Sequence, residues 1–253
     1  MAAARREPRY ARWSGIEREL RKAGVLLIAG VDEVGRGSLA GPVVASAVIM
    51  PPGVPAIRGV DDSKRLTRKE REKLFVRIRE RAVAFGIGAA SVREIDTLNI
   101  FNASVLAMRR ALARLAIHPD HVLVDGRRLR SLGVEHTAVI DGDAKCFNVA
   151  CASILAKVTR DRLMTRLSVR YPDFSWASNC GYGTADHVRG LTRRGATVHH
   201  RRLFVAAVEA RLRAGASLEE AGEVLVPIDG PPPTFPPTPV GDVTPPLVTL
   251  AQT

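Results

Sequence analysis

The apolar positions of the chain fall into two kinds of segment, short continuous runs and longer stretches with a helical period. The short runs predict β-strands, and the first two of them are rich in β-branched residues. They cover residues 25–32, 43–50, 82–91, 121–125 and 134–140. The longer stretches predict helices over residues 67–81, 102–116, 147–171, 184–194 and 201–214. Thr67 and Glu70 stand at capping-box spacing at the start of the first helix.

The order of these elements indicates an α/β fold. The early strands follow one another closely and the later strands alternate with helices, which predicts a sheet that is partly antiparallel and partly parallel, with helices on its faces. The domain then closes with a helical C-terminal part. Residues 227–253 hold nine of the 16 prolines and no Lys or Arg, so we expect an extended, disordered tail there. Residues 1–12 are also expected to be disordered, and residues 13–226 to form one domain.

The charge of the chain indicates a polyanionic partner. The chain has 38 Lys and Arg residues and 26 Asp and Glu residues, which gives a net charge of +12. A balance this basic is typical of proteins that bind nucleic acid, and less often of proteins that bind a membrane surface. Most of the cations are arginine, which suits phosphate binding, although a GC-rich genome is the favoured explanation.

Three features favour a soluble, cytoplasmic protein without a membrane span. The three cysteines include no CxxC pair, so we expect a reducing compartment and neither a disulfide framework nor a zinc site. Residues 1–7 lack the apolar run of a signal peptide. The longest uncharged stretch, residues 37–57, is interrupted by four prolines, which argues against a transmembrane helix.

Carboxylates stand at the ends of three predicted strands. Asp32 and Glu33 end the first run, Asp125 ends the fourth, and Asp141 and Asp143 follow the fifth. If these strands lie side by side, the carboxylates meet at one edge of the sheet, where their repulsion calls for cations. Oxygen ligands without nearby His or Cys suit Mg²⁺ or Mn²⁺, and two such ions about 3.5–4 Å apart serve phosphoryl transfer. The spacing does not choose between Asp141 and Asp143, and each Asp alone could be a turn former.

The remaining acids in loops and on helices are expected to be caps and partners in ion pairs. These are, among others, Asp61, Asp62, Asp96, Asp161 and Asp173. Close to the first carboxylates, Gly35-Arg36-Gly37 could bring the backbone near a nucleic acid strand, although alone it would indicate only a tight bend with an exposed arginine.

Five further residues, Lys64, Lys145, Ser153, Lys157 and Tyr182, are candidates for contacts with nucleic acid. Lys64 and Lys145 lie beside acidic segments, and Lys157 shares a helix face with Ser153. Each lysine could instead be an ordinary solvated charge. Tyr182 lies between two glycines and could stack on a base or sugar, or could belong to the core.

Taken together, these segments resemble the type 2 ribonuclease H family (ribonuclease HII), over about residues 25–208 and in the family's order. The matching motifs are Asp32-Glu33-Val34-Gly35-Arg36-Gly37, in which Val34 replaces the usual alanine, Asp62-Ser63-Lys64-Arg65-Leu66, Val124-Asp125-Gly126, Gly142-Asp143-Ala144-Lys145, the helix segment from Ala152 to Asp161, Gly181-Tyr182-Gly183-Thr184, His187, Gly195 and His200-Arg201. This agreement is too extensive to be a coincidence of composition.

The resemblance implies the ribonuclease H-like fold, with a mixed five-stranded sheet flanked by helices. It implies two divalent ions, Mn²⁺ or Mg²⁺, held by a catalytic set in which it selects Asp143: Asp32, Glu33, Asp125 and Asp143. It also implies that the junction between a ribonucleotide and the next deoxynucleotide is read by Gly35, Arg36, Gly37 and Tyr182.

The implied activity is hydrolysis of the RNA strand of RNA/DNA hybrids and incision 5′ to single ribonucleotides in duplex DNA, leaving 3′-hydroxyl and 5′-phosphate ends. Such an enzyme would remove ribonucleotides during DNA replication and repair, and we expect it to act as a monomer. The alternatives are a general metal-dependent nuclease of the same fold and a non-catalytic protein that binds RNA/DNA hybrids. Activity on all-DNA duplexes would indicate the first, and binding without cleavage the second.

Overall fold

The computed structural model describes residues 13, 15–53 and 55–223. The segments expected to be disordered, residues 1–12 and 227–253, lie outside the described residues. Within the described part, five strands form one sheet in the order β3-β2-β1-β4-β5. The strands are β1 (Ile28–Val34), β2 (Val43–Ile49), β3 (Ala84–Ala90), β4 (His121–Asp125) and β5 (Thr137–Val139). β2 is antiparallel to β1 and β3, and β4 is parallel to β1 and β5, so the predicted mixed α/β sheet is confirmed.

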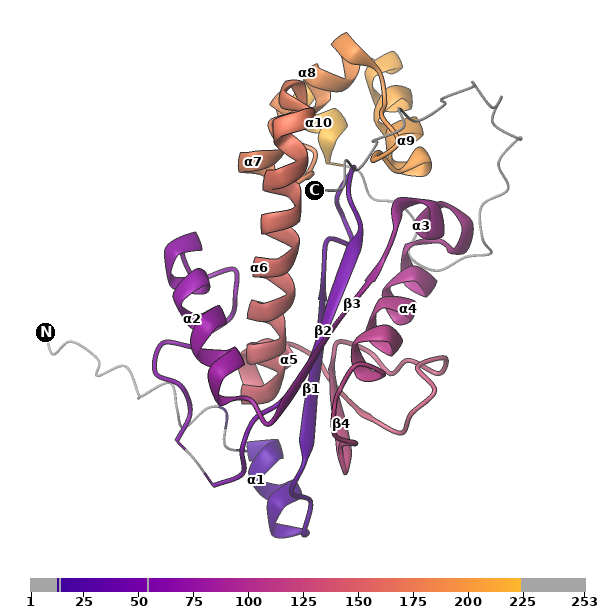
Figure 1. The fold of residues 1–253 in the computed structure, drawn as a ribbon. Coiled ribbons are helices and arrows are strands. Elements are labelled where there is room, and N and C mark those ends of the chain that lie inside the picture. Colours follow the sequence, from indigo (N-terminus) through magenta and orange to yellow (C-terminus); the bar gives the residue numbers. More distant parts are fainter. Residues whose placement is uncertain (1–12, 14, 54, 224–253) are drawn as a thin grey trace, which may run out of the picture.

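Helices cover both faces of this sheet (Figure 1). On one face α6 (Phe147–Arg170) packs against β1 and β2, with α2 (Arg68–Arg81) beside it. On the other face α4 (Ile100–Leu112) packs against β2 and β3, and α3 (Val92–Leu98) precedes it. The predicted helical C-terminal part lies at one end of the sheet. The remaining helices are α1 (Gly15–Lys22), α5 (Gly142–Lys145), η2 (Pro172–Phe174), α7 (Trp176–Asn179), α8 (Ala185–Arg194), α9 (Arg202–Arg213) and α10 (Leu218–Gly222).

The central strands are apolar on both sides because each face is covered by helices. All seven residues of β2 are buried. Val43 and Ile49 belong to the core cluster that includes residues of α4, whereas Val48 belongs to the cluster that includes residues of α2 and α6. This alternation is the period of two that side chains follow along a strand.

One glycine sets the distance between α6 and the sheet. A Cβ at Gly30 of β1 would lie 2.1 Å from the backbone carbonyl carbon of Asn148, in the first turn of α6. The helix therefore approaches β1 more closely than any side chain there would allow. This contact lies two residues before Asp32 and brings the helix face that carries Ser153 next to that carboxylate.

Several element boundaries differ from the sequence prediction. β1 begins at Ile28 and continues through Asp32 and Glu33 to Val34, because pairing with β2 extends to that residue. Asp32 and Glu33 therefore lie inside the strand and point to opposite faces of the sheet. β5 is limited to residues 137–139, and the helix predicted from residue 102 begins at Ile100 after α3, which was not predicted. The predicted capping box of Thr67 and Glu70 is confirmed at the start of α2.

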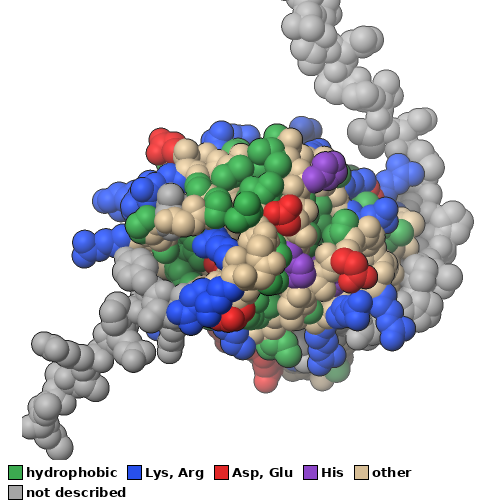
Figure 2. Space-filling view, turned by 90° about the horizontal axis from the view of Figure 1, so that it is seen from below, with side chains coloured by type: hydrophobic (Ala, Val, Ile, Leu, Met, Phe, Trp, Pro, Cys, Tyr) green, Lys and Arg blue, Asp and Glu red, His purple; other side chains and the backbone are tan. Residues whose placement is uncertain are grey.

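Lys and Arg side chains are spread over the end of the molecule that lies opposite the C-terminal helices. Figure 2 views the end opposite the C-terminal helices, and the cations there surround the outline of the protein instead of forming one stripe. The excess of positive charge thus favours a polyanionic partner without marking its path. No helix in the described ranges is both long and apolar enough to cross a membrane.

Candidate active site

Four carboxylates come together at one edge of the sheet. Asp32 and Glu33 lie on β1, Asp125 is the last residue of β4, and Asp143 lies on α5. β1 and β4 are parallel neighbours, and their register places Asp32 level with Asp125. The backbone N–H of Gly142 donates a hydrogen bond of 2.6 Å to Oδ1 of Asp125, which fastens α5 to the end of β4. The structure therefore gathers the acids that the sequence placed at strand ends.

The turn after β5 separates the two acids between which the spacing could not choose. Asp141 has a left-handed backbone (φ 56°), and its side chain is 74% exposed and lies 3.9 Å from the ammonium of Lys145. Asp143, two residues later, is only 8% exposed. The left-handed residue thus directs one carboxylate to solvent and the other to the cluster.

The carboxylates of this cluster are difficult to ionise together. Burial, and then the charges of Glu33, Asp125 and Asp143, raise the pKa of Asp32 well above its usual range, against a hydrogen bond from Ser153. Burial and the charge of Asp125 raise the pKa of Asp143 to about 6. Burial also raises the pKa of Glu33, although the guanidinium of Arg36 opposes this at 3.2 Å from Oε1. The cluster is therefore a place where positive charge is favoured.

The chemistry of these residues fits divalent ions. The donors are carboxylate oxygens, which hard cations such as Mg²⁺ and Mn²⁺ prefer. Bound cations would remove the mutual repulsion that raises the pKa values of Asp32 and Asp143. Across residues 13–223, apart from the undescribed positions 14 and 54, no three Asp, Glu, His or Cys side chains are grouped as a ready-made cage for an ion. Side-chain adjustment would accompany binding.

The loop before α2 adds residues to the cluster. Asp62, assigned from the sequence to caps and ion pairs, accepts a hydrogen bond of 2.9 Å from the backbone N–H of Lys64, and it also contributes to raising the pKa of Asp143. Burial lowers the pKa of Lys64, but the charges of Asp143 and Asp62 outweigh it and raise that pKa. Between them, Oγ of Ser63 lies 2.9 Å from Oγ of Ser153. The loop thus brings the candidate Lys64 to the cluster, together with an additional carboxylate.

The two glycines around Arg36 have different surroundings. Gly35 has a φ of +92°, and a Cβ there would lie 2.1 Å from Nε of Arg160. Gly35 is therefore required by the buried Arg160 side chain and by its own backbone conformation. Gly37 is exposed, has ordinary backbone angles, and has no atom within 4 Å of its Cβ position. Of the two, Gly37 is the one at which a ligand could approach the backbone.

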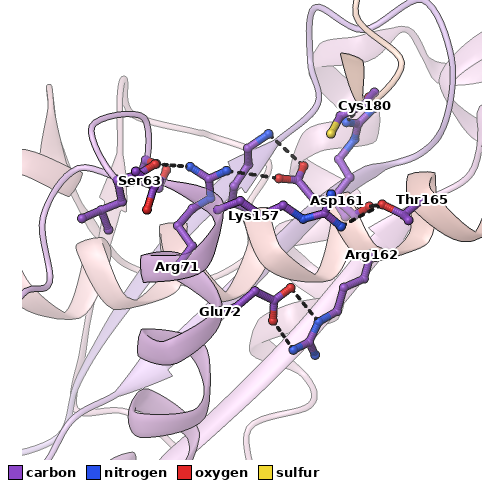
Figure 3. Close-up of polar contacts among 12 residues, drawn as sticks. Ser63, Arg71, Glu72, Lys157, Asp161, Arg162, Thr165 and Cys180 are labelled. Atoms are coloured by element: carbon purple, nitrogen blue, oxygen red, sulfur yellow. Dashed lines mark hydrogen bonds and ion pairs between the residues drawn. The ribbon is translucent and has the colours of Figure 1, made fainter. Parts of the chain in front are cut away.

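Lys157 and Tyr182 lie together on the same side of α6. The ammonium of Lys157 donates a hydrogen bond of 2.8 Å to Asp161, which also forms an ion pair with Arg71 (Figure 3). Nζ of Lys157 lies 5.8 Å from the centre of the Tyr182 ring. Tyr182 is half-buried, so part of it remains accessible. Asp161 is a partner in ion pairs, as the sequence indicated.

Lys145 is the candidate that the structure does not bring to the cluster. Its ammonium donates a hydrogen bond of 2.6 Å to the carbonyl of Ile140 and faces the exposed Asp141. Both partners belong to the turn between β5 and α5. This placement fits a residue that supports the turn.

Two buried arginines lie in the family motifs but received no role from the sequence. Arg160 on α6 and Arg201 before α9 are fully buried and donate to backbone carbonyls of the segments that carry Arg36 and Tyr182. In a chain so rich in arginine, only their positions in the family motifs could have drawn attention to them.

A cleft of about 320 Å³ adjoins the carboxylates between α4 and the ends of β1 and β4. Glu33, Arg36 and Asp125 form its polar side, and α4 contributes Phe101 and Met108. The cluster therefore opens onto a concave surface on the α4 side of the sheet.

Comparison with known proteins gives one consistent family. The family model for ribonuclease HII matches residues 29–207. A ribonuclease HII from Paraburkholderia xenovorans is 49% identical over 201 residues, covering 79% of this chain and 81% of the relative. A ribonuclease HII from Granulibacter bethesdensis is 54% identical over 188 residues, covering 73% of this chain and 85% of the relative.

Solved structures agree with these sequence relatives. The crystal structure of ribonuclease H2 from Pyrococcus horikoshii has a TM-score of 0.62 and 28% identity, covering 74% of this chain and 98% of that protein. A Bst ribonuclease HIII in complex with Mn²⁺ has a TM-score of 0.56 and 19% identity, covering 75% and 70%, and supports the fold alone.

Proposed function

The chain belongs to the ribonuclease HII family and is a ribonuclease H endonuclease, and from this premise we propose that it incises duplex DNA on the 5′ side of single ribonucleotides, as well as the RNA strand of RNA/DNA hybrids. The observation that supports this most is the meeting of Asp32, Glu33, Asp125 and Asp143 beside the segments that carry Gly37 and Tyr182. The products would be 3′-hydroxyl and 5′-phosphate ends.

In this proposal the four carboxylates hold two divalent ions, Mg²⁺ or Mn²⁺. When bound, such ions supply an activated water and stabilise charge on the departing 3′-oxygen. Ser153 lies beside Asp32 and favours its ionised form, and the Gly142 N–H keeps Asp125 in place through its hydrogen bond. Lys64, which lies among the acids, would contact a phosphate next to the cut.

Some of the candidate substrate contacts would bind a phosphate, and the others would bind the sugar or base. Lys157 lies beside Tyr182, where it would meet a backbone phosphate while the ring stacks on the sugar or base of the next nucleotide. The 2′-hydroxyl is the group that distinguishes RNA from DNA at the cut, and the backbone at Gly37 is open enough to approach it. Arg36 would shield the charge between Glu33 and the substrate.

Cleavage of an end-labelled duplex tests the proposal. The substrate carries one ribonucleotide, the control duplex is all DNA, and both are incubated with and without Mg²⁺ or Mn²⁺. A metal-dependent nick 5′ to the ribonucleotide, with the control intact, is expected. Cleavage of both duplexes would replace the proposal with a general nuclease, and binding without cleavage would replace it with a hybrid-binding protein.

Tyr182→Ala is expected to reduce cleavage of the single-ribonucleotide duplex about 10- to 100-fold, because stacking on one base contributes about 1–3 kcal/mol. The ring is half-buried at the surface, so the melting temperature should change little. The measurement is kcat/KM for this duplex. Tyr182→Phe keeps the ring and is the matched control, with activity close to wild type. Equal losses in both variants would rule out stacking.

Gly37→Ala is expected to reduce the same cleavage about tenfold without changing the melting temperature. The added methyl group meets no atom of the protein within 4 Å, so a loss of activity reports a close approach by the substrate. Gly15→Ala, at a second glycine with nothing within 4 Å, is the control and should be fully active. Full activity of Gly37→Ala would exclude close contact there.

A further inference from the structure

The segments that carry Arg36, Gly37 and Tyr182 lie outside the main sheet, and they are held by one isolated antiparallel bridge, between Ala40 and His200, and by buried side chains. Residues 35–42 join β1 to β2, residues 180–183 follow α7, and residues 199–201 precede α9. A few backbone bonds connect them: the N–H of Leu39 donates to Gly181 at 2.8 Å, and the N–H of Gly41 donates to His199 at 2.8 Å. Most carbonyls of this region need other donors, since buried backbone oxygens are almost always hydrogen-bonded.

Arg160 supplies three of these donors from α6. Its guanidinium donates to the carbonyls of Pro42 at 2.9 Å, Ala40 at 3.0 Å and Cys180 at 2.7 Å. Its Cζ atom lies 5.7 Å from the centre of the Tyr182 ring. One buried side chain therefore joins the segment after Arg36 to the segment of Tyr182.

Arg201 holds the other side of the first segment. It donates to the carbonyl of Gly35 at 2.6 Å, of Arg36 at 2.8 Å, and of Gly41 at 2.9 and 3.0 Å. The two arginines thus fix both ends of the 35–42 segment. In the part of the chain that the structure describes, neither guanidinium lies within 4.0 Å of a carboxylate.

A buried cation without an anion is costly, and a stable core does not require one. What the fork of an arginine provides is several donors in one rigid plane, which a lysine ammonium cannot reproduce. Both guanidiniums donate hydrogen bonds to backbone carbonyls of the segments that carry Arg36 and Tyr182. We therefore relate the free-energy cost of burying the two guanidiniums to the backbone conformation that they hold in those segments.

The helix that carries Arg160 also carries the support of a catalytic carboxylate. Ser153, Lys157 and Arg160 stand four and three residues apart, so they share one face of α6. Ser153 lies close enough to Asp32 to lower the pKa of that carboxyl, and Arg160 donates to backbone carbonyls of the segments of Arg36 and Tyr182. Seven residues of helix correspond to about 10 Å. α6 thus holds the carboxylates and the segments of Arg36 and Tyr182 at a fixed distance from each other.

We propose that Arg160 and Arg201 are positioning residues that lock the 35–42 and 180–183 segments into one unit at a fixed distance from the carboxylates, and that this lock determines selectivity for a single ribonucleotide. The inference rests on the proposed function. A duplex with one ribonucleotide offers one 2′-hydroxyl, which must be met in one register. A continuous RNA/DNA hybrid offers a 2′-hydroxyl at every register, so it tolerates loosened segments better.

The test compares Arg160→Lys and Arg201→Lys with wild type on both substrates. Each variant keeps the positive charge but loses the planar fork. We expect kcat/KM for the single-ribonucleotide duplex to fall at least tenfold more than kcat/KM for the continuous hybrid. Arg162→Lys is the matched control, since Arg162 lies on the same helix and pairs with Glu72 away from these segments. Ile78→Ala, at a buried core position of α2, controls for lost stability. In both controls the ratio should equal that of wild type.

Hydrogen exchange of backbone amides provides a readout that does not depend on activity. The amides of Leu39, Gly41 and Arg201 should exchange faster in the two variants, while those of β2 keep their protection. Equal losses on both substrates, no loss, or unchanged exchange in these segments would overturn the inference. If wild type fails to cut the single-ribonucleotide duplex, the proposed function falls, and the exchange data still decide whether the arginines hold the segments.

Discussion

Asp125→Asn is expected to stop cleavage while leaving the fold and substrate binding intact. Asparagine has the same size, and its side-chain oxygen can still accept the hydrogen bond from Gly142 that fastens α5 to β4. The variant therefore removes a charge and little else. A divalent ion contributes several kcal/mol to stabilising charge in the transition state. A loss of about 4 kcal/mol corresponds to about 10³-fold in rate, so we expect at least that reduction.

Binding should respond in the opposite direction. The four carboxylates repel a polyanion when no cation is present, and neutralising one of them reduces that repulsion. The dissociation constant of Asp125→Asn for a ribonucleotide-containing duplex should therefore equal that of wild type or be lower. Single-turnover cleavage and equilibrium binding measure the two effects separately.

The neighbouring turn offers a matched control. Asp141→Asn makes the same chemical change 16 residues along the chain, at an exposed carboxylate whose left-handed backbone suits asparagine. It should cleave at the wild-type rate. A rate for Asp125→Asn above a tenth of wild type would remove Asp125 from the site, and a loss in Asp141→Asn would show that the turn, not the charge, matters.

The convergence of these acids could be predicted because it depends on strand order. A run of apolar residues that ends in Asp125 is visible in the sequence, and parallel strands end at the same edge of a sheet. The same reasoning placed Asp32 and Glu33 at a strand end, whereas β1 continues to Val34. That extension depends on pairing with β2, a contact between segments that periodicity does not describe.

Two parts of the site could not be predicted from pattern. Asp62 follows no strand and lies in a loop, so its approach to Asp143 depends on how that loop packs on α6 through Ser63. Arg160 and Arg201 are indistinguishable by residue type from the solvated arginines around them. Their role comes from backbone carbonyls, which carry no sequence signal, and from a fold that buries both guanidiniums.

Asp143→Asn is expected to stabilise the protein without divalent ions at neutral pH and to remove most of its response to them. The pKa of Asp143 is about 6 in the folded chain, raised above its usual value of 3.8, chiefly by burial and by Asp125. A carboxyl group with a raised pKa binds its proton more tightly when folded. Wild type therefore loses stability as the pH rises from about 4 to about 6. The Asn variant has no carboxyl group at this position, so it does not undergo this loss of stability.

Buried histidines also change the stability with pH. The stability of Asp143→Asn must therefore be compared with that of wild type at each pH. Burial lowers the pKa of His187 to about 4 and of His200 to about 3. A histidine with a lowered pKa has the opposite effect, since its contribution to stability is lost as the pH falls below its unfolded value. The two effects overlap between pH 4 and 6 and cancel in part in wild type. The difference in melting temperature between Asp143→Asn and wild type isolates the carboxylate.

This difference should be near zero at pH 4 and reach its full value above pH 6. Since solvent reaches part of the Asp143 environment, its pKa shift corresponds to about 1 kcal/mol after discounting for screening, or about 2–4 °C for a domain of this size. A difference that is constant with pH, or negative at pH 7.5, would contradict the origin assigned to the raised pKa.

Addition of Mg²⁺ or Mn²⁺ is expected to raise the melting temperature through the same carboxylates. An ion at 100 times its dissociation constant stabilises the folded state by about 2.7 kcal/mol, or about 5–10 °C in wild type at pH 7.5. At pH 5 the shift should be smaller, because protons on Asp32 and Asp143 compete with the ion. Asp143→Asn should show less than half of the wild-type shift, and Asp141→Asn all of it. Equal shifts at both pH values, or in both variants, would place the ions away from this cluster.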